Sequence, residues 1–556
     1  MHEKYPERSP ANFRILRVTA AMLVLHLLLS AHYLAVGSPS PSWRILIPSG
    51  PLLMAFACTI AVSRTGSGTP GRRLLRYILT ISAAAGYGLS ILNSSGQWFF
   101  TLFYREDFSV IHDAVLIPGL FSMLLGEPAM DGDMLSLLSW AVVGTVLFLL
   151  GILLTVLLLR IGRSRRGREN QAETGWKGGV LVPAIFFLMA VIGFFIFPET
   201  RVLAGSESGS GSTYVRPVSN TAVQVAENYA FPGISDKDIH LLVIESYGST
   251  LFLKDEYLDA MESSYRRLGM MLGDLGFKVY SGFVRSPVFG GRSWLADSSL
   301  LTATQISSQR MFDDRVASEQ PAFFLQLLEN GGYHRVYAAP GTYESWESWR
   351  KTFPFEEYFF RYDFGYEGPF VSFGAMPDQY FLDVIGRRLQ TDRKEFIMAL
   401  LVSSHVPFES VPPYFQEWSF DQYGREYTEE NISIYDNNWL SGNELAEGYL
   451  ASIDYSLQSA LGYLAQHASD SGLMIVVGDH QPRKPVSTPD AGYTVPVHVI
   501  LPANSSVRLP EEWGLSRGLH PGVPSANEVL YPEIAAIPRL MDRILHWRPE
   551  MELILP

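Results

Sequence analysis

The chain has 556 residues, of which 47% are hydrophobic, and it carries a formal net charge of −13. This length exceeds that of one ordinary domain, and the acidic balance argues against nucleic acid as a partner. Its only cysteine, Cys58, rules out an intramolecular disulfide and a cysteine-based zinc site.

The first 200 residues contain five apolar segments that are long enough to cross a bilayer. These segments are residues 15–36, 45–62, 74–92, 135–159 and 180–197. A shorter segment, residues 110–125, carries a histidine, an aspartate and a proline, so we interpret it as interfacial or re-entrant. The sequence therefore predicts an integral membrane domain of five transmembrane helices over residues 1–198.

Basic residues set the orientation of these spans. They cluster before the first span, between the second and the third, and after the fourth, whereas the loops at 37–43 and 94–134 contain one basic residue, Arg105. By the positive-inside rule, the N-terminus lies in the cytoplasm and the chain beyond residue 198 lies outside the cell membrane. A sixth span would leave the arginine-rich 160–178 segment outside, so five is the better count.

A Gly/Ser-rich segment, residues 204–220, follows the membrane domain and shows no periodicity. This composition predicts a linker, which we extend over residues 199–235. The outer domain then occupies residues 236–556.

Apolar strand patterns alternate with helical patterns in the outer domain. The strands are expected at 240–245, 278–284, 333–339, 395–404 and 473–479, and the helices at 258–276, 293–304, 323–332, 377–389 and 448–468. Alternation of this kind predicts an α/β fold, with a mostly parallel sheet and helices on its faces.

Polar residues follow three of these strands. Glu245 ends the first, His405 follows the fourth, and Asp479 and His480 follow the fifth. Ligands collect at the carboxyl ends of strands in open α/β sheets, so these side chains are expected to converge on one site. An acid beside an imidazole suits Zn²⁺ or Mn²⁺, although a turn carboxylate such as Glu245 often serves only the backbone and the Asp-His pair could be a surface turn.

Ser293 follows a Gly-Gly-Arg turn at the start of a predicted helix. A serine there can simply cap the helix. It is also where a nucleophile would be placed, because helix-end amides stabilise a phosphoryl oxygen and a metal would lower the pKa of the hydroxyl. His405 could donate a proton or a hydrogen bond to a phosphate oxygen, although a single histidine at a strand end is often structural.

Four motifs carry a family resemblance: IESYGST (244–250), GGRSWLADSSLLTA (290–303), SSHVPF (403–408) and VVGDHQP (476–482). In this order they resemble the sulfatase/alkaline phosphatase superfamily, and more narrowly the lipoteichoic acid synthases and related phosphoglycerol transferases. The resemblance implies a sulfatase-like fold with one divalent metal ion, Mn²⁺ first and Zn²⁺ or Mg²⁺ as alternatives. It assigns the metal to Glu245, Ser293, Asp479 and His480, makes Ser293 the nucleophile, and gives His405 to the phosphate.

The departures from the family are informative. The nucleophile is serine where the synthases usually have threonine, which keeps the hydroxyl chemistry. Sulfatases need Cys or Ser followed by x-Pro-x-Arg, whereas Ser293 is followed by Trp-Leu-Ala-Asp, so sulfate ester hydrolysis is not expected. The head-group element of the synthases survives only loosely as ESWESWR (344–350). Trp346, Arg350 and Arg292 are the candidate substrate-binding residues, and plain packing is the alternative for the tryptophans.

The resemblance implies a transferase that moves phosphoglycerol from a membrane phospholipid, phosphatidylglycerol, through a phospho-serine intermediate. The acceptor is expected to be a hydroxyl of a glycan or polymer in the cell envelope. A phosphoethanolamine transferase is the first alternative, and the absence of cysteine from the outer domain counts against it. A phosphodiesterase or phosphatase and a catalytically inactive scaffold remain as further alternatives.

Overall fold

The computed structural model describes residues 20–27, 29, 50–64, 69–103, 145–146, 149–157, 237–342, 347–372, 376–388, 393–435, 442–488 and 491–545. The chain divides into two compact units, Met1–Tyr214 and Val215–Pro556, which are described separately. The predicted boundaries at residues 198 and 236 stay predictions.

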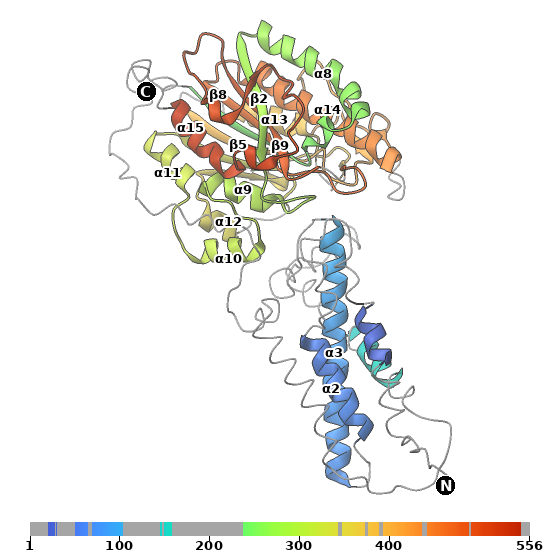
Figure 1. The fold of residues 1–556 in the computed structure, drawn as a ribbon. Helices are drawn as coiled ribbons and strands as arrows, with labels where there is room; N and C mark the ends of the chain where they lie inside the picture. Colours follow the sequence, from blue (N-terminus) through green and yellow to red (C-terminus); the bar gives the residue numbers. More distant parts are fainter. Residues whose placement is uncertain are drawn as a thin grey trace, which may run out of the picture. The chain divides into compact units, whose positions relative to one another are not determined.

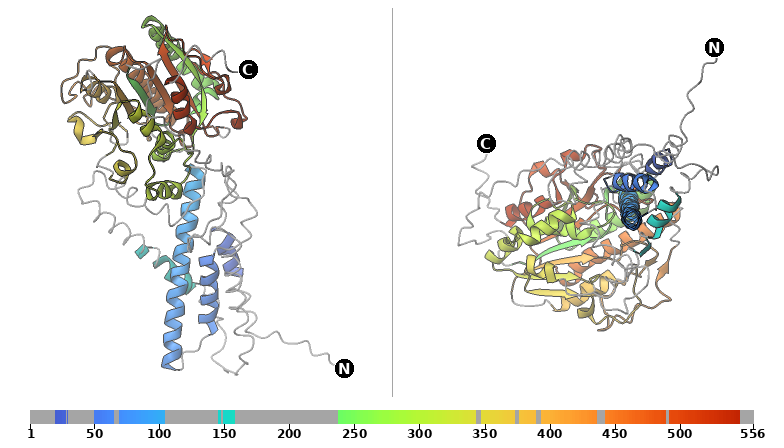
Figure 2. Two further views of the ribbon diagram at one scale, coloured as in Figure 1. Left: turned by 90° about the vertical axis from the view of Figure 1, so that its left-hand side faces the viewer. Right: turned by 90° about the horizontal axis from the view of Figure 1, so that it is seen from below.

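Helices make up the described part of the N-terminal unit (Figures 1 and 2). α2 spans Gly50–Arg64 and α3 spans Pro70–Phe103, and residues 20–27 and 149–157 are also helical. α3 starts at a proline, whose fixed φ suits a first helical position. α2 packs against α3, where the hydroxyls of Thr59 and Tyr87 lie 2.9 Å apart. A side chain at Gly151 would collide with the Ala84 carbonyl, so glycine permits a close contact between the helix at 149–157 and α3.

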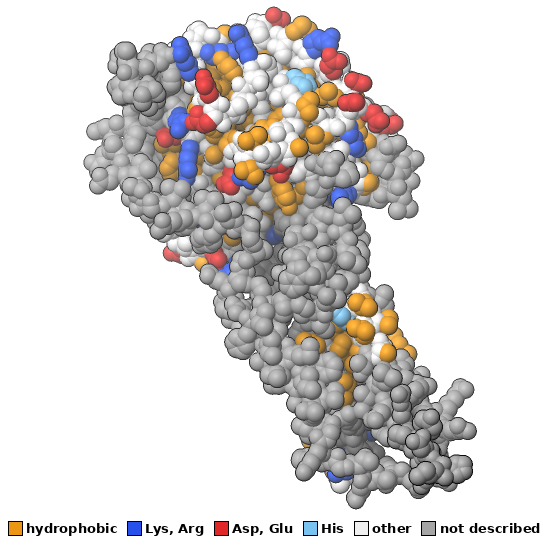
Figure 3. Space-filling model, viewed as in Figure 1, with side chains coloured by type: hydrophobic (Ala, Val, Ile, Leu, Met, Phe, Trp, Pro, Cys, Tyr) orange, Lys and Arg blue, Asp and Glu red, His pale blue; other side chains and the backbone are white. Residues whose placement is uncertain are grey.

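One described helix, Pro70–Gln97, is long and apolar enough to cross a membrane, and a shorter apolar helix covers Leu52–Val62. Apolar side chains gather on the visible surface of this unit (Figure 3), and Tyr77 and Ile81 of α3 are more than half exposed. The predicted span at 74–92 lies within the longer helix. The spans at 15–36, 45–62 and 135–159 are described only in part. The span at 180–197 and the interfacial or re-entrant segment at 110–125 lie outside the described residues. The five-helix arrangement therefore stays a prediction.

The second unit is built on an eight-stranded mixed sheet of order β10-β2-β9-β8-β1-β5-β3-β4. The strands are β1 (Ile239–Ile244), β2 (Phe277–Arg285), β3 (His334–Ala339), β4 (Glu357–Phe360), β5 (Glu395–Leu401), β8 (Leu473–Gly478), β9 (Thr494–Pro502) and β10 (Ser516–Arg517). The run from β8 to β4 is parallel, whereas β9, β2 and β10 pair antiparallel at the other side. A two-stranded sheet pairs β6 (Ser410–Val411) with β7 (Ser433–Ile434).

All five predicted strands are present, and the prediction of parallel pairing is right for the centre of the sheet. The strand at 278–284 belongs to the antiparallel part of this mostly parallel sheet, because β2 runs antiparallel to β9. β9 itself was not predicted. Its sequence, TVPVHVILP, contains Pro496 and a buried His498, and a proline within an apolar run weakens the strand signal. β4 was also missed, since four residues are too few to show a period.

Helices cover both faces of the sheet (Figure 1). α8 (Asp255–Asp274), α13 (Asp378–Arg388) and α14 (Gly442–His467) share one apolar core, and α9 (Ser293–Thr302), α10 (Gln309–Ala317), α11 (Phe323–Asn330), α12 (Glu347–Thr352) and α15 (Ile537–Leu545) share the other. Side chains of β1 alternate between the two cores: Leu242 faces the first, and Leu241 and Val243 face the second. Burial on both faces explains why β1 is apolar apart from His240, which is itself buried.

Short 3₁₀ helices complete the unit: η6 (Ser249–Phe252), η7 (Arg361–Phe364), η8 (Glu511–Trp513), η9 (Glu528–Leu530) and η10 (Ile534–Ala536). α8 carries two acidic residues in its first turn, which complement the helix dipole. It is followed by Gly276 at φ 81°, a left-handed position that favours glycine.

A buried polar chain ties α8 to the antiparallel side of the sheet. Ser281 Oγ donates to the Gly518 carbonyl, so it accepts from His498 Nδ1 at 2.7 Å. His498 is therefore the Nδ1–H tautomer, and its Nε2 accepts from the Tyr247 hydroxyl at 2.8 Å. The Tyr265 hydroxyl in turn donates to Tyr247 at 2.8 Å. A neutral imidazole satisfies every partner, and burial lowers the pKa of His498 to about 3.

The donor and acceptor roles in this chain of hydrogen bonds predict that Tyr247→Phe destabilises the protein more than Tyr265→Phe. The first change leaves His498 Nε2 buried without a donor, which costs roughly 1–3 kcal/mol, whereas the second removes only the outermost donor and costs about 1 kcal/mol or less. Phenylalanine keeps the ring packing at both positions. Thermal unfolding of the two detergent-solubilised variants measures the difference in stability. An equal or larger loss of stability for Tyr265→Phe would contradict the assigned donor and acceptor roles.

Candidate metal centre

Three adjacent parallel strands deliver the predicted site residues to one edge of the sheet. Glu245 directly follows β1, His405 follows β5, and Asp479 and His480 directly follow β8. In the sheet β1 lies between β8 and β5, with Ile244 beside Gly478 on one side and Leu401 on the other. The carboxyl ends of these strands therefore lie together, as the sequence predicted.

Glu245, Asp479 and His480 form a buried cluster whose ligand atoms all lie within 4.8 Å of one another. His480 Nε2 is 3.2 Å from Glu245 Oε1 and 3.3 Å from Asp479 Oδ2. Asp479 Oδ1 accepts from the backbone amides of Ser246 and His480 at 2.8 Å and 2.6 Å. These bonds hold one oxygen of Asp479 on the backbone, so the other oxygen faces the cluster.

Ser293 joins this cluster from the start of α9. Its hydroxyl donates to Glu245 Oε2 at 2.9 Å and lies 3.3 Å from His480 Nε2. The residue at the N-cap position is Arg292, and it makes no side-chain cap hydrogen bond. The Ser293 hydroxyl therefore points at the cluster.

The turn before Ser293 is strained. Gly290 and Gly291 have positive φ angles, and Arg292 adopts the left-handed conformation at φ 68°, which costs a non-glycine residue roughly 1–2 kcal/mol. Two bonds hold the turn to the segment after β8. Arg483 Nε donates to the Gly290 carbonyl at 2.7 Å, and the Gly290 amide donates to the Gln481 carbonyl at 3.1 Å. The position of Ser293 is thus tied to the segment that carries Asp479 and His480.

Hydrogen bonds fix the ring nitrogens of both histidines. His480 Nδ1 lies 2.8 Å from the Gln481 carbonyl, and His405 Nδ1 lies 2.6 Å from the Val406 carbonyl. A carbonyl only accepts, so each Nδ1 donates and each neutral ring carries its lone pair on Nε2. For His480 this is the nitrogen that faces the carboxylates, which suits a metal ligand.

Asp378 positions the turn that carries His405. Its Oδ1 accepts from the amides of Val402 and Ser403 at 2.8 Å and 3.1 Å, and its Oδ2 accepts from the Ser456 hydroxyl at 2.6 Å. Burial raises the pKa of Asp378 to about 6. Sequence reasoning missed this residue, because an aspartate at a helix start is an ordinary helix-dipole feature.

Burial and neighbouring charge perturb the cluster strongly. Burial and the charge of Glu245 raise the pKa of Asp479, while the carboxylates raise the pKa of His480 in spite of its burial. The pKa of Glu245 is lowered by the His480 and His405 charges against the effect of burial. Burial lowers the pKa of His405, which favours its neutral form. Without a further cation the cluster therefore retains protons.

Asp297 is a second acid that the sequence analysis did not select. It lies one helical turn after Ser293, is 2% exposed, and its Oδ1 has no partner among the described residues. Burial, followed by the charges of Asp479 and Glu245, raises its pKa well above the usual range. Its position four residues after Ser293 in a helix was the available signal, since i and i+4 share a face.

Two glycines let the loops approach one another closely. A Cβ at Gly478 would lie 1.9 Å from the Tyr247 carbonyl oxygen, and one at Gly248 would lie 2.2 Å from Gln481 Oε1. The segments after β1 and β8 therefore pack backbone against backbone. This contact brings Glu245 beside Asp479 and His480.

The predicted substrate-binding residues have different placements. Trp346 lies outside the described residues. Arg350 stacks on the ring of Tyr358 at 4.4 Å, and none of its described contacts involves the cluster. Arg292 is 6% exposed and directly precedes Ser293. Trp349 is fully buried against Phe353, so it serves packing.

The donor set fits one divalent cation. Glu245 and Asp479 bring two buried carboxyl groups beside one imidazole. Asp297 is a third buried acid that feels their charge, and its Oδ1 has no hydrogen-bond partner among the described residues. Burying carboxylates without a cation is costly, so a bound cation would compensate the charge that protons otherwise neutralise. Glu245, Asp479, His480 and the Ser293 hydroxyl are the residues that would hold it. Mixed oxygen and imidazole donors suit Mn²⁺, Zn²⁺ or Mg²⁺.

Residues 298–511 match the Sulfatase family, and this match confirms the resemblance to the sulfatase and alkaline phosphatase superfamily. The matched segment includes His405, Asp479 and His480. No curated protein matches the chain.

Several solved structures are similar to the chain. The lipoteichoic acid synthase LtaP from Listeria monocytogenes is 14% identical, with 58% of this chain and 74% of that chain covered and a TM-score of 0.37. The lipooligosaccharide phosphoethanolamine transferase EptA from Neisseria meningitidis is 13% identical, with 82% and 88% covered and a TM-score of 0.43. The phosphoglycerol transferase GacH from Streptococcus pyogenes, in complex with sn-glycerol-1-phosphate, is 13% identical, with 58% and 84% covered and a TM-score of 0.33.

We expect a divalent metal to displace protons when it binds this cluster. The pKa values of Asp479 and His480 are raised in the metal-free protein, so the pair retains a proton that a metal would displace, and metal affinity rises as pH rises through the titration of the pair. Calorimetric titration of Mn²⁺ into metal-stripped protein, at one pH in two buffers of different ionisation enthalpy, measures the release. Identical heats in both buffers would contradict the expectation, and Asp479→Asn should release fewer protons than the wild type.

Proposed function

We propose that this chain, whose residues 298–511 match the Sulfatase family, is a metal-dependent transferase that moves a phosphoglycerol group from a membrane phospholipid, phosphatidylglycerol, to a hydroxyl of an envelope glycan or polymer. The observation that carries the proposal is the position of the Ser293 hydroxyl. It lies 2.9 Å from Glu245 and 3.3 Å from His480, at the start of a helix and after a strained turn. A hydroxyl among metal-ligand residues is the arrangement that an activated oxygen nucleophile needs.

In the first step Ser293 Oγ forms a bond to the phosphorus of the donor. Glu245 Oε2 already accepts the hydroxyl hydrogen and so orients the oxygen for attack. The serine hydroxyl loses its proton to solvent, the bond from phosphorus to diacylglycerol breaks, the diacylglycerol oxygen takes up a proton from solvent, and the phosphoglyceryl group stays on the serine. A divalent ion held by the cluster would supply charge neutralisation to the phosphate and lower the pKa of the serine hydroxyl.

In the second step an acceptor hydroxyl attacks the phosphoserine, and the serine oxygen leaves. His405 is suited to take the proton of that hydroxyl, because its pKa is lowered and its Nε2 carries the lone pair. Asp378 holds the turn that carries His405, so it acts as a positioning residue.

A lipid donor is favoured over a soluble one by the N-terminal unit. The described helix Pro70–Gln97 is long and apolar enough to cross a bilayer, and the sequence predicts four further spans. An outer domain attached to such spans meets donor lipids at the membrane surface, with the catalytic domain outside the cytoplasm.

Sulfate ester hydrolysis is not proposed, in spite of the family match. Conversion to formylglycine needs x-Pro-x-Arg after the nucleophile, and Trp294, Leu295 and Ala296 follow Ser293. The glycerol head group is assigned to Arg292, Trp346 and Arg350 by the resemblance. A phosphoethanolamine donor would use the same nucleophile and metal, so the substrate test below includes it.

We expect the full-length protein in neutral detergent with Mn²⁺ to release diacylglycerol from head-group-labelled phosphatidylglycerol and to acquire the label. Ser293→Ala should reduce release at least about a thousandfold, because it removes the attacking atom. Ser298→Ala is the matched control, since this hydroxyl of the same helix donates only to the Trp294 carbonyl.

Three results would count against this proposal. Turnover of phosphatidylethanolamine in place of phosphatidylglycerol would keep the site and overturn the donor. Diacylglycerol release that is insensitive to an added acceptor, with free glycerol phosphate as the product, would indicate a hydrolase. Equal release by wild type and Ser293→Ala would overturn the role of the serine.

A further inference from the structure

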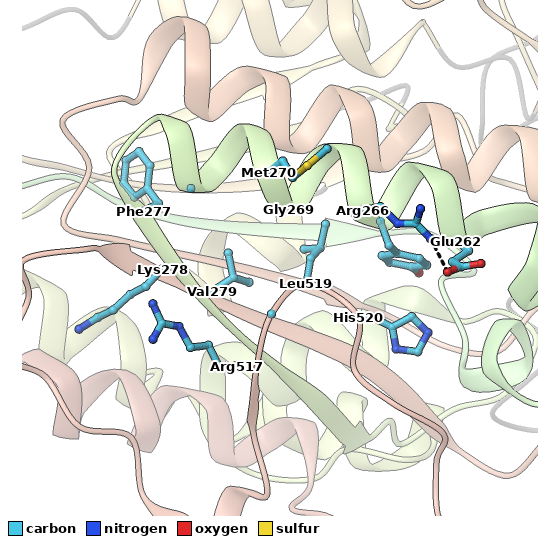
Figure 4. A pocket seen from close by; sticks show the side chains of 13 residues that line it. Glu262, Arg266, Gly269, Met270, Phe277, Lys278, Val279, Arg517, Leu519 and His520 are labelled. Carbon is cyan, nitrogen blue, oxygen red and sulfur yellow. Dashed lines mark hydrogen bonds and ion pairs between the residues drawn. The ribbon is translucent and has the colours of Figure 1, made fainter.

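A groove of about 560 Å³ lies on the catalytic domain between α8, the start of β2 and residues 517–520 (Figure 4). Its Lys278 end is at the opposite end of the sheet from the metal cluster. Arg285 and Thr494 pair at the cluster end, whereas Lys278 lies seven residues earlier on β2, roughly 23 Å away at 3.3 Å per residue. The other end of the groove is lined by Tyr265, whose hydroxyl bonds Tyr247. The Lys278 end is therefore separate from the site of the proposed transfer.

Two cations face one end of this groove. Lys278 and Arg517 lie side by side in Figure 4, close enough that the Arg517 charge contributes to lowering the pKa of Lys278. Lys278 Nζ donates to the Ser505 carbonyl, and neither side chain has a carboxylate partner among the described residues. At the other end Arg266 is already neutralised by Glu262 at 2.6 Å. One end of the groove thus has uncompensated positive charge in a chain whose net charge is −13.

The remainder of the groove is largely apolar. Phe277, Val279 and Leu519 are buried behind it, and Met270 is 60% exposed along its side. Gly269 and Gly273 of α8 also face it. No atom lies within 4 Å of a Cβ built on Gly273, so packing does not require glycine there. A glycine in a helix costs about 1 kcal/mol relative to alanine, and here its structural effect is to leave the groove open.

The walls of the groove are held together from beneath. Tyr265 lines one wall, and Gly518 lines the other. The buried chain of Tyr247, His498 and Ser281 joins the Tyr265 hydroxyl to the Gly518 carbonyl through consecutive hydrogen bonds. The groove is therefore preformed, which lowers the entropic cost of binding a ligand.

We propose that this groove binds one anionic phospholipid, with the phosphate between Lys278 and Arg517 and an acyl chain along Met270, Gly273 and Leu519. A polyanionic glycan or polymer would need cations spaced along the whole groove. The cations without a carboxylate partner are confined to one end, the middle of the groove is largely apolar, and the other end carries the Arg266–Glu262 ion pair. The shape and charge match an amphiphile with a single anionic head. The proposal concerns a second lipid site and does not depend on the transfer reaction.

The test uses the full-length protein in neutral detergent and a phosphatidic acid that carries a photoactivatable diazirine on its acyl chain. After irradiation, peptide mass spectrometry locates the label, which we expect on α8 or residues 517–520. Lysophosphatidic acid should compete with the probe, and monopalmitoylglycerol or glycerol 3-phosphate should compete at least about tenfold less well, because each lacks half of the recognised ligand.

Two variants and one control define the site. Lys278→Gln/Arg517→Gln removes the phosphate contacts. Gly273→Leu places a side chain in the open groove, at a position where a Cβ meets no neighbouring atom. Each should reduce labelling of the groove at least about tenfold. Lys351→Gln is the matched control, because this exposed cation lies on α12 outside the groove, and it should label as the wild type does. Thermal unfolding shows that each variant is folded.

The proposal is overturned if the label is absent from the groove, or if both groove variants are labelled there as strongly as the wild type. If glycerol 3-phosphate competes as well as lysophosphatidic acid, the groove is a simple anion site. If monopalmitoylglycerol competes as well as lysophosphatidic acid, the groove does not recognise the charge of the head group. Label only at peptides around Ser293 would contradict this proposal and leave the transferase proposal intact, so the two can fail separately.

Discussion

The buried negative charge at the ends of β1 and β8 is the constraint on which the rest of the second unit depends. Glu245 and Asp479 are 7% and 1% exposed, and His480 is the imidazole between them. Carboxylates are stable in such a place only when protons or a cation compensate them. The raised pKa values of Asp479 and Asp297 mean that protons compensate the charge in the metal-free protein. A divalent metal would compensate it in place of these protons. The same ion would then place the Ser293 oxygen beside a phosphate.

The loops around this charge are held by contacts that have no catalytic chemistry of their own. Gly478 lets the segment after β8 touch the backbone of Tyr247, and Asp378 fastens the turn that carries His405. Arg483 ties the strained Gly-Gly-Arg turn to the same segment. Tyr247 also begins the buried chain that supports the distant groove. Tyr247 therefore contributes to the packing of both sites.

Much of the fold and the cluster could be predicted, because the signals are local. An apolar run that ends in Glu245 or in Asp479 and His480 identifies a buried strand and its ligand, and parallel order brings their ends together. β9 escaped prediction because Pro496 and His498 interrupt its apolar pattern, although the sheet buries both. Asp297 and Asp378 escaped because their roles depend on which distant segments lie beside them. The direction of β2 is likewise set by its partner β9.

The most direct test of the account is the metal content of the purified full-length protein, measured by inductively coupled plasma mass spectrometry after expression with added Mn²⁺. The account predicts one divalent ion per chain in the wild type and in Ser298→Ala, and at least about a tenfold lower content in Asp479→Asn, which loses a charged ligand. A wild-type protein without metal, or an Asp479→Asn protein with undiminished metal, would contradict it.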